Sequence, residues 1–87
     1  MEKAVVVLKN EVGLHARPAS MFVKVASKYK SDISIVKDGQ AFIAKSILQI
    51  LSIGAIKDDE LTIEVNGPDE KEAVVALKEL FDNNFGE

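Results

Sequence analysis

Residues 4–26 read AVVVLKNEVGLHARPASMFVKVA and predict a strand, a loop and the start of a helix. The apolar run 4–8 is typical of a buried strand, and residues 9–14 form the loop after it. Pro18 suits the first turn of a helix, because it lacks an N–H and its φ angle is already helical. Apolar residues then recur with helical spacing at Ala19, Phe22, Val23 and Ala26. His15, the single histidine of the chain, is therefore expected at a helix N-terminus.

The surroundings of His15 predict a phosphoryl acceptor. The backbone N–H groups and the positive dipole end of a helix N-terminus favour an anion, here through the amides of Ala16 and Arg17. Arg17 adds a guanidinium that can hold two phosphoryl oxygens at once, and Pro18 fixes the start of the helix. A simpler alternative is that His15 only caps the helix. The presence of Gly13, Arg17 and Pro18 around it favours the phosphoryl acceptor.

The middle of the chain predicts a hairpin followed by a short helix. Residues 32–37 and 40–44 flank Asp38-Gly39, a dipeptide that readily supplies the positive φ angles of a tight turn. Residues 46–53 are expected to form a helix that ends before Gly54. The hairpin makes two antiparallel strands.

The last third predicts a strand and a final helix. Leu61, Ile63 and Val65 alternate as in a strand, and Asp69 with Glu72 three residues later predicts an N-terminal cap. The apolar face of the final helix is formed by Ala73, Val74, Leu77, Leu80 and Phe81. The element order is β-α-β-β-α-β-α, which favours an α+β fold with an antiparallel sheet and all helices on one face.

Composition and charge narrow the class of protein. The 87 residues are 47% hydrophobic and contain no cysteine, so we expect one small domain over residues 1–87 without a disulfide or a metal site. There are 11 basic and 14 acidic residues, which argues against nucleic-acid binding. No apolar run has transmembrane length, so we expect a cytoplasmic protein that does not insert into membranes. Nucleotide-binding and serine-hydrolase motifs are absent from the sequence.

Two motifs together give the chain a family resemblance. Residues 13–19, with residues 45–48 (KSIL) and 51–55 (LSIGA), resemble HPr, the histidine-containing phosphocarrier of the bacterial phosphoenolpyruvate:sugar phosphotransferase system. The resemblance covers essentially the whole chain. It implies an open-faced sandwich with strand order 1-4-2-3. It also implies that His15 accepts phosphate from phospho-enzyme I and donates it to sugar-specific IIA proteins, without a cofactor and without enzymatic activity of its own.

The short second helix carries more apolar residues than one buried face needs. They are Ile47, Leu48, Ile50, Leu51 and Ile53. If Ile50 and Ile53 face the core, then Ile47, Leu48 and Leu51 form an exposed apolar patch, which commonly marks a protein partner site. The alternative is a helix sunk in the core. The resemblance favours the patch, because this surface of HPr binds enzyme I and IIA proteins.

Basic residues form a stripe on the first helix. Arg17, Lys24 and Lys28 fall within one sector of the helix, and Lys45 is expected to extend their field. The stripe predicts electrostatic attraction of acidic partners, with Lys24 and Lys45 as candidate binding residues. The alternative is a charged helical face that is merely solvated.

Ser46 has a structural and a regulatory interpretation. Ser46 with Gln49 three residues later is a capping box. Its sequence context also resembles the regulatory phosphorylation site of many HPr proteins, which implies an HPr kinase/phosphorylase and a transcription regulator as further partners. The chain departs from that pattern at Ile43, where asparagine is usual, and at Gln49, where glycine is frequent. These departures bear on whether the serine kinase recognises Ser46, and they leave the carrier chemistry intact.

Two other functions are compatible with the sequence. A nitrogen-branch or regulatory paralogue would keep His15 and serve different partners. A non-catalytic interaction module would use His15 only as a cap. We expect a monomeric sugar-branch carrier.

Overall fold

The computed structural model describes residues 1–86. Its strands and α-helices follow one another in the predicted order, with bounds that differ from the expected ones by no more than two residues, and one further short turn was not predicted. The elements are β1 (Glu2–Val7), α1 (Ala16–Ala26), β2 (Asp32–Lys37), β3 (Gln40–Ile43), α2 (Ile47–Ser52), β4 (Glu60–Asn66), α3 (Glu70–Asp82) and the short turn, η1 (Asn84–Gly86).

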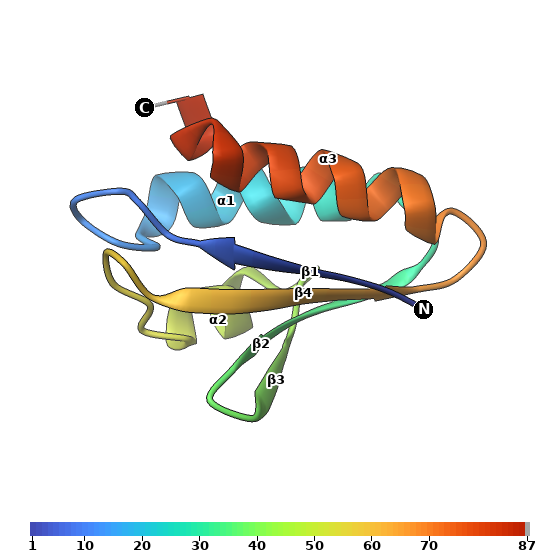
Figure 1. Cartoon of the computed structure of the whole chain (residues 1–87), viewed down its shortest axis with the longest axis horizontal. Coiled ribbons are helices and arrows are strands. Elements are labelled where there is room, and N and C mark those ends of the chain that lie inside the picture. The colour runs from blue at the N-terminus through green and yellow to red at the C-terminus, as the bar shows by residue number, and fades with distance from the viewer. Residues whose placement is uncertain (87) are drawn as a thin grey trace.

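The four strands form one antiparallel sheet in the order β1-β4-β2-β3. This order confirms the one that the family resemblance implied. The register brings Ile63 of β4 opposite Ile35 of β2, and Ile35 opposite Phe42 of β3. α1 and α3 lie side by side along the sheet, and α1 also packs against α2 (Figure 1).

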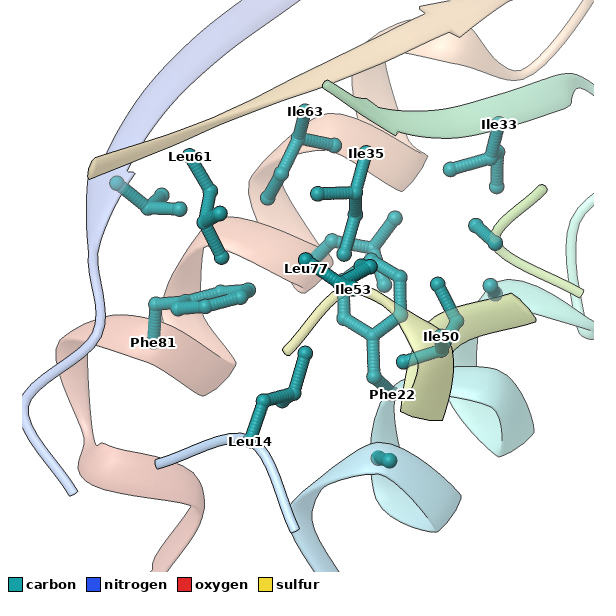
Figure 2. Packing of buried hydrophobic residues seen from close by; sticks show 14 of the residues in the cluster. Leu14, Phe22, Ile33, Ile35, Ile50, Ile53, Leu61, Ile63, Leu77 and Phe81 are labelled. Carbon is teal, nitrogen blue, oxygen red and sulfur yellow. The ribbon is translucent and has the colours of Figure 1, made fainter. Parts of the chain in front are cut away.

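The core lies between one face of the sheet and the three helices. Ile35, Leu61 and Ile63 point from the strands toward Phe22 of α1 and Leu77 of α3 (Figure 2). The apolar faces predicted for the helices are confirmed, because Ala19, Phe22, Ala73 and Leu77 are fully buried. Each strand and each helix has one apolar face, and the layered arrangement buries all of these faces against one another.

The opposite face of the sheet is open. Val5 remains exposed, and the one aromatic residue on a strand, Phe42, lies on the covered face beside the core. RNA-binding sheets of similar element order stack bases on aromatic side chains of the open face. Within the four strands described here, that face carries no aromatic residue.

The β2–β3 hairpin turns as predicted. Asp38 and Gly39 both have positive φ angles, 51° and 80°, which are the left-handed values that a tight two-residue turn needs. The turn aligns Lys37 with Gln40 and so sets the register of the whole hairpin.

The predicted side-chain cap at Asp69 is wrong. Asp69 occupies the N-cap position of α3, but its carboxylate makes no hydrogen bond to that helix. It accepts hydrogen bonds from the backbone N–H groups of Lys30 and Ser31, at 2.8 and 3.0 Å, and from the Ser31 hydroxyl. These bonds, that of the Ser31 hydroxyl first, lower the pKa of the Asp69 carboxyl below its ordinary value. Tertiary donors from the turn before β2 outcompete the helix.

Candidate phosphoryl-acceptor site

The strand–loop–helix at the start of the chain places His15 at the N-terminus of α1. His15 is the N-cap residue, with extended backbone angles (φ −86°, ψ −173°), and its carbonyl accepts the first helical hydrogen bond from the Ala19 N–H at 3.0 Å. Ala16, Arg17 and Pro18 form the first turn. The position predicted from Pro18 is confirmed.

Gly13 fixes the loop that leads to His15. Its φ angle is +77°, and a Cβ atom there would lie 2.5 Å from the carbonyl oxygen of Ala55. A side chain is therefore excluded both by the backbone conformation and by space. The neighbouring Leu14 N–H donates to the same Ala55 carbonyl at 3.0 Å, and the Leu14 side chain is inserted in the core (Figure 2).

The imidazole of His15 does not cap α1. No side-chain hydrogen bond joins it to the start of the helix. The residue as a whole is half-buried, and its Nε2 atom is buried. The solvent-accessible part of His15 therefore lies away from Nε2.

The first turn of α1 suits a dianion. The positive end of the dipole of this 11-residue helix lies at the first turn, where the backbone N–H groups have no partner within the helix. No residue of this turn is acidic. Arg17 is exposed two residues after His15, whereas Pro18 is buried and anchors the turn. Lys24, in the last turn of the same helix, is also exposed.

Lys45 lies apart from this cluster. Its ammonium group donates a hydrogen bond of 2.7 Å to the carbonyl oxygen of Tyr29, just beyond the C-terminus of α1. Because α1 has 11 residues and is therefore about 16 Å long, this contact holds Lys45 at the end of the helix opposite His15. The positive charge that Lys45 was predicted to add to the basic stripe therefore lies far from His15.

The exposed patch predicted on α2 is confirmed as a surface. Ile50 and Ile53 are 0% and 8% exposed and face the core. The exposed fractions of Ile47, Leu48 and Leu51 are 37%, 77% and 39%. Packing of α2 on α1 joins this surface to the helix that carries His15.

Ser46 caps α2, but the predicted capping box is only half formed. The Ser46 hydroxyl accepts a hydrogen bond from the Gln49 N–H at 3.3 Å. The side chain of Gln49 does not return to Ser46. Its Oε1 accepts instead from the Ile43 N–H at 2.9 Å, so that the two positions departing from the common HPr pattern are bonded to one another. The glycine frequent at position 49 could not make this bond.

Two exposed apolar residues near His15 were not identified from the sequence. Val12 is 75% exposed in the loop before His15, and Ile56 is 65% exposed in the loop after α2. An ion pair of 2.8 Å between Glu11 and Lys57 ties the two loops together, and its hydrogen bond lowers the pKa of Glu11. Periodicity does not reveal such residues, because loops have none.

Within residues 1–86, no group of three or more histidine, cysteine, aspartate or glutamate residues could hold a metal ion. No helix in that part of the chain is long and apolar enough to cross a membrane.

Comparison with known proteins gives a consistent answer. The family model described as "PTS HPr component phosphorylation site" matches residues 2–83. The phosphocarrier protein HPr of Mycoplasma genitalium is 41% identical over 85 residues, which is 97% of each chain. The crystal structure of HPr-C-His from Thermoanaerobacter tengcongensis has a TM-score of 0.96 and 42% identity, covering 100% of this chain and 98% of that one.

A regulatory relative is also similar. Crh, described as a catabolite repression protein of Bacillus subtilis that forms a dimer with a swapped domain, has a TM-score of 0.77 and 34% identity, and 97% of each chain is covered. The family model and the HPr relatives both cover nearly the whole chain, including the segment around His15. The chain therefore belongs to the HPr family of phosphocarrier proteins of the phosphotransferase system.

Proposed function

We propose that this protein accepts a phosphoryl group on Nδ1 of His15 from phospho-enzyme I and donates it to sugar-specific IIA proteins. The observation that carries the proposal is the placement of His15 at the N-cap of α1, at the positive end of the helix dipole and two residues before the exposed Arg17. Nε2 is buried, which leaves Nδ1 as the nitrogen to be phosphorylated. We also propose that the protein acts as a monomer, with a swapped dimer of the kind described for Crh as the alternative.

The first turn of α1 supplies the stabilisation of the transferred group. In the proposed step a nitrogen lone pair of His15 attacks phosphorus as the bond to the donor breaks. Arg17 and the outward-pointing N–H groups of Ala16 and Arg17 compensate the charge on the phosphoryl oxygens. Because this stabilisation is weak and the site lies at the surface, the phosphoryl group can be transferred onward to the next protein. The partner supplies the remaining groups of the transition state.

The experiment that tests the function uses the whole 87-residue chain. It is incubated with phosphoenolpyruvate, enzyme I and magnesium, and acid-labile phosphate is measured before and after addition of a IIA protein. Labelling that is lost to IIA supports the sugar-branch carrier. Labelling that is retained with sugar-specific IIA but lost to a nitrogen-branch IIA would favour the paralogue, and no labelling would favour the interaction module.

The partner surface is proposed to be the α2 patch, Ile47, Leu48 and Leu51, together with Lys24 on α1 and Lys45 at the far end of that helix. Val12 and Ile56, on the two loops joined by the Glu11–Lys57 ion pair, are proposed to add to it. Replacement of Leu48 by aspartate tests it. Leu48 is 77% exposed, so the free energy of unfolding should change by no more than about 0.5 kcal/mol. The KM of enzyme I for the protein should rise about tenfold, because a charge enters a desolvated contact.

The matched control for Leu48 is Val75, which is 56% exposed on α3. The Val75→Asp variant carries the same new charge on a different face and should have the KM of the parent. If both variants raised KM equally, the effect would be one of net charge. If Leu48→Asp lost most of its stability instead, the patch assignment would be wrong.

Ser46 is proposed as a regulatory phosphorylation site for an HPr kinase/phosphorylase, with a transcription regulator as the reader of the modified form. The Ser46→Asp variant should melt no lower than the parent, because aspartate is also a good N-cap and its charge suits the start of α2. It should accept phosphate from enzyme I with a raised KM, since a negative charge lies beside the apolar patch. Melting curves and transfer kinetics measure the two effects.

The alanine variant separates capping from charge at Ser46. Ser46→Ala loses the bond to the Gln49 N–H and should lose about 1 kcal/mol of stability. Its transfer kinetics should equal those of the parent. If Ser46→Asp also transferred at the parental rate, Ser46 would be a cap alone.

A further inference from the structure

Asn10 joins the loop before His15 to the C-terminal end of the chain. Its side chain is 6% exposed, and its Nδ2 donates a hydrogen bond of 3.2 Å to the carbonyl oxygen of Asn84, 74 residues away. The backbone carbonyl of Asn10 accepts a hydrogen bond of 3.0 Å from the Gly13 N–H. Asn10 therefore shapes the turn that leads to His15 and also connects that turn to the C-terminal turn η1.

The conformation of the C-terminal turn, η1, is fixed by a buried side chain. Asn84 and Phe85 have φ angles of 50° and 55°, in the left-handed region that residues with side chains rarely adopt. Phe85 is 2% exposed, and its ring packs edge-to-face on Phe81 with a centroid distance of 4.8 Å. The buried ring holds the turn in this unfavourable conformation and so directs the Asn84 carbonyl at Asn10.

The loop has room to move without this bond. A hollow of about 380 Å³ is lined by Lys9, Asn10, Glu11, Val12 and Asn84. On the other side of the loop, the Leu14 N–H is held by the Ala55 carbonyl. The Asn10 hydrogen bond connects two of the residues that line this hollow. Its loss would let the first half of the loop shift and alter the approach to His15.

We propose that Asn10 is a positioning residue for phosphoryl transfer, acting on His15 through its hydrogen bond to the C-terminal turn. The inference rests on the proposed function of His15. A small misplacement of a reacting group costs rate more than binding, because geometry matters most in the transition state. The effect of Asn10 is therefore expected in kcat and not in KM.

Two variants remove the donor. Asn10→Ala and the isosteric Asn10→Asp should both lower kcat for phosphorylation by enzyme I about fivefold, as expected for the loss of one hydrogen bond. The KM should stay within about twofold of the parent, because the α2 patch is untouched. Asn10→Asp keeps the shape of the side chain and decides the matter if the alanine variant fails to fold. Lys9→Ala, the exposed neighbour, is the control and should have the kcat of the parent.

A double-mutant cycle tests the route through the C-terminal turn. Phe85→Ala should loosen the turn and lower kcat, whereas Phe85→Leu keeps an apolar anchor and should restore most of it. The double variant Asn10→Ala/Phe85→Ala should be little slower than either single variant, because both remove the same connection.

Measurement of the parent protein in parallel distinguishes failure of the proposed function from failure of the role proposed for Asn10. A parent that accepts no phosphate refutes the proposed function. A parent that is phosphorylated normally, with Asn10 variants of equal kcat or with fully additive effects in the cycle, overturns the positioning role. A lowered melting temperature with unchanged kcat makes Asn10 structural and also overturns it.

Discussion

The His15→Ala variant is expected to fold like the parent and to carry no acid-labile phosphate. His15 is the only histidine of the chain, so no other imidazole can form a phosphoramidate. His15 is half-buried and lies at the end of α1 rather than in the core, so removal of its side chain should cost little stability. Labelling with phosphoenolpyruvate, enzyme I and magnesium, followed by acid treatment, measures the loss.

Folding of the His15→Ala variant is checked by its melting curve and by its binding to enzyme I. Both should match the parent within the error expected for a surface substitution. Acid-labile labelling of this variant at the parental level would contradict the assignment of His15. A variant that neither folds nor binds would be replaced by His15→Gln, which keeps a polar side chain of similar reach.

The second large effect is expected for Arg17→Ala, which should slow phosphoryl transfer about 100-fold. The estimate follows the loss of one preorganised donor to a developing anion. Arg17 lies in the first turn of α1 and is exposed, so folding should be nearly unchanged. Single-turnover transfer from phospho-enzyme I measures the rate directly.

Two further variants show which property of Arg17 acts. Arg17→Lys keeps the charge without the planar fork and should recover only part of the rate. Lys28→Ala removes an exposed charge beyond the other end of α1 and should transfer at the parental rate. Equal rates for Arg17→Ala and the parent would exclude Arg17 from the site.

Local patterns predicted the elements well, because each depends on residues close in the chain. Pro18 and the spacing of Ala19 and Phe22 set the start of α1, and Asp38-Gly39 set the hairpin turn. The strand order came from the family resemblance and not from any pattern, since pairing of β1 with β4 joins segments more than 50 residues apart.

Long-range polar contacts are what the sequence could not supply. Asp69 has the spacing of a cap, yet its carboxylate binds the N–H groups of Lys30 and Ser31. A spacing rule covers only donors on the same helix and ignores those that folding brings from elsewhere. The bond from Asn10 to Asn84 is hidden for the same reason.

The candidate site was predictable in its centre and less so at its edge. His15, Arg17 and the exposed face of α2 follow from helix geometry. The positions of Lys45, bonded to Tyr29, and of Ile56, on a separate loop, depend on tertiary packing. Predictions from one helix therefore described the acceptor, and the structure was needed to outline the surface around it.

The decisive experiment on phosphorylation of His15 is phosphorus and nitrogen NMR of the 87-residue chain after incubation with phosphoenolpyruvate, enzyme I and magnesium. One acid-labile phosphoryl group per chain is expected, bonded to Nδ1 of His15, and it should disappear when a IIA protein is added. Absence of a phosphohistidine signal, with enzyme I shown to be phosphorylated in the same tube, would contradict this expectation.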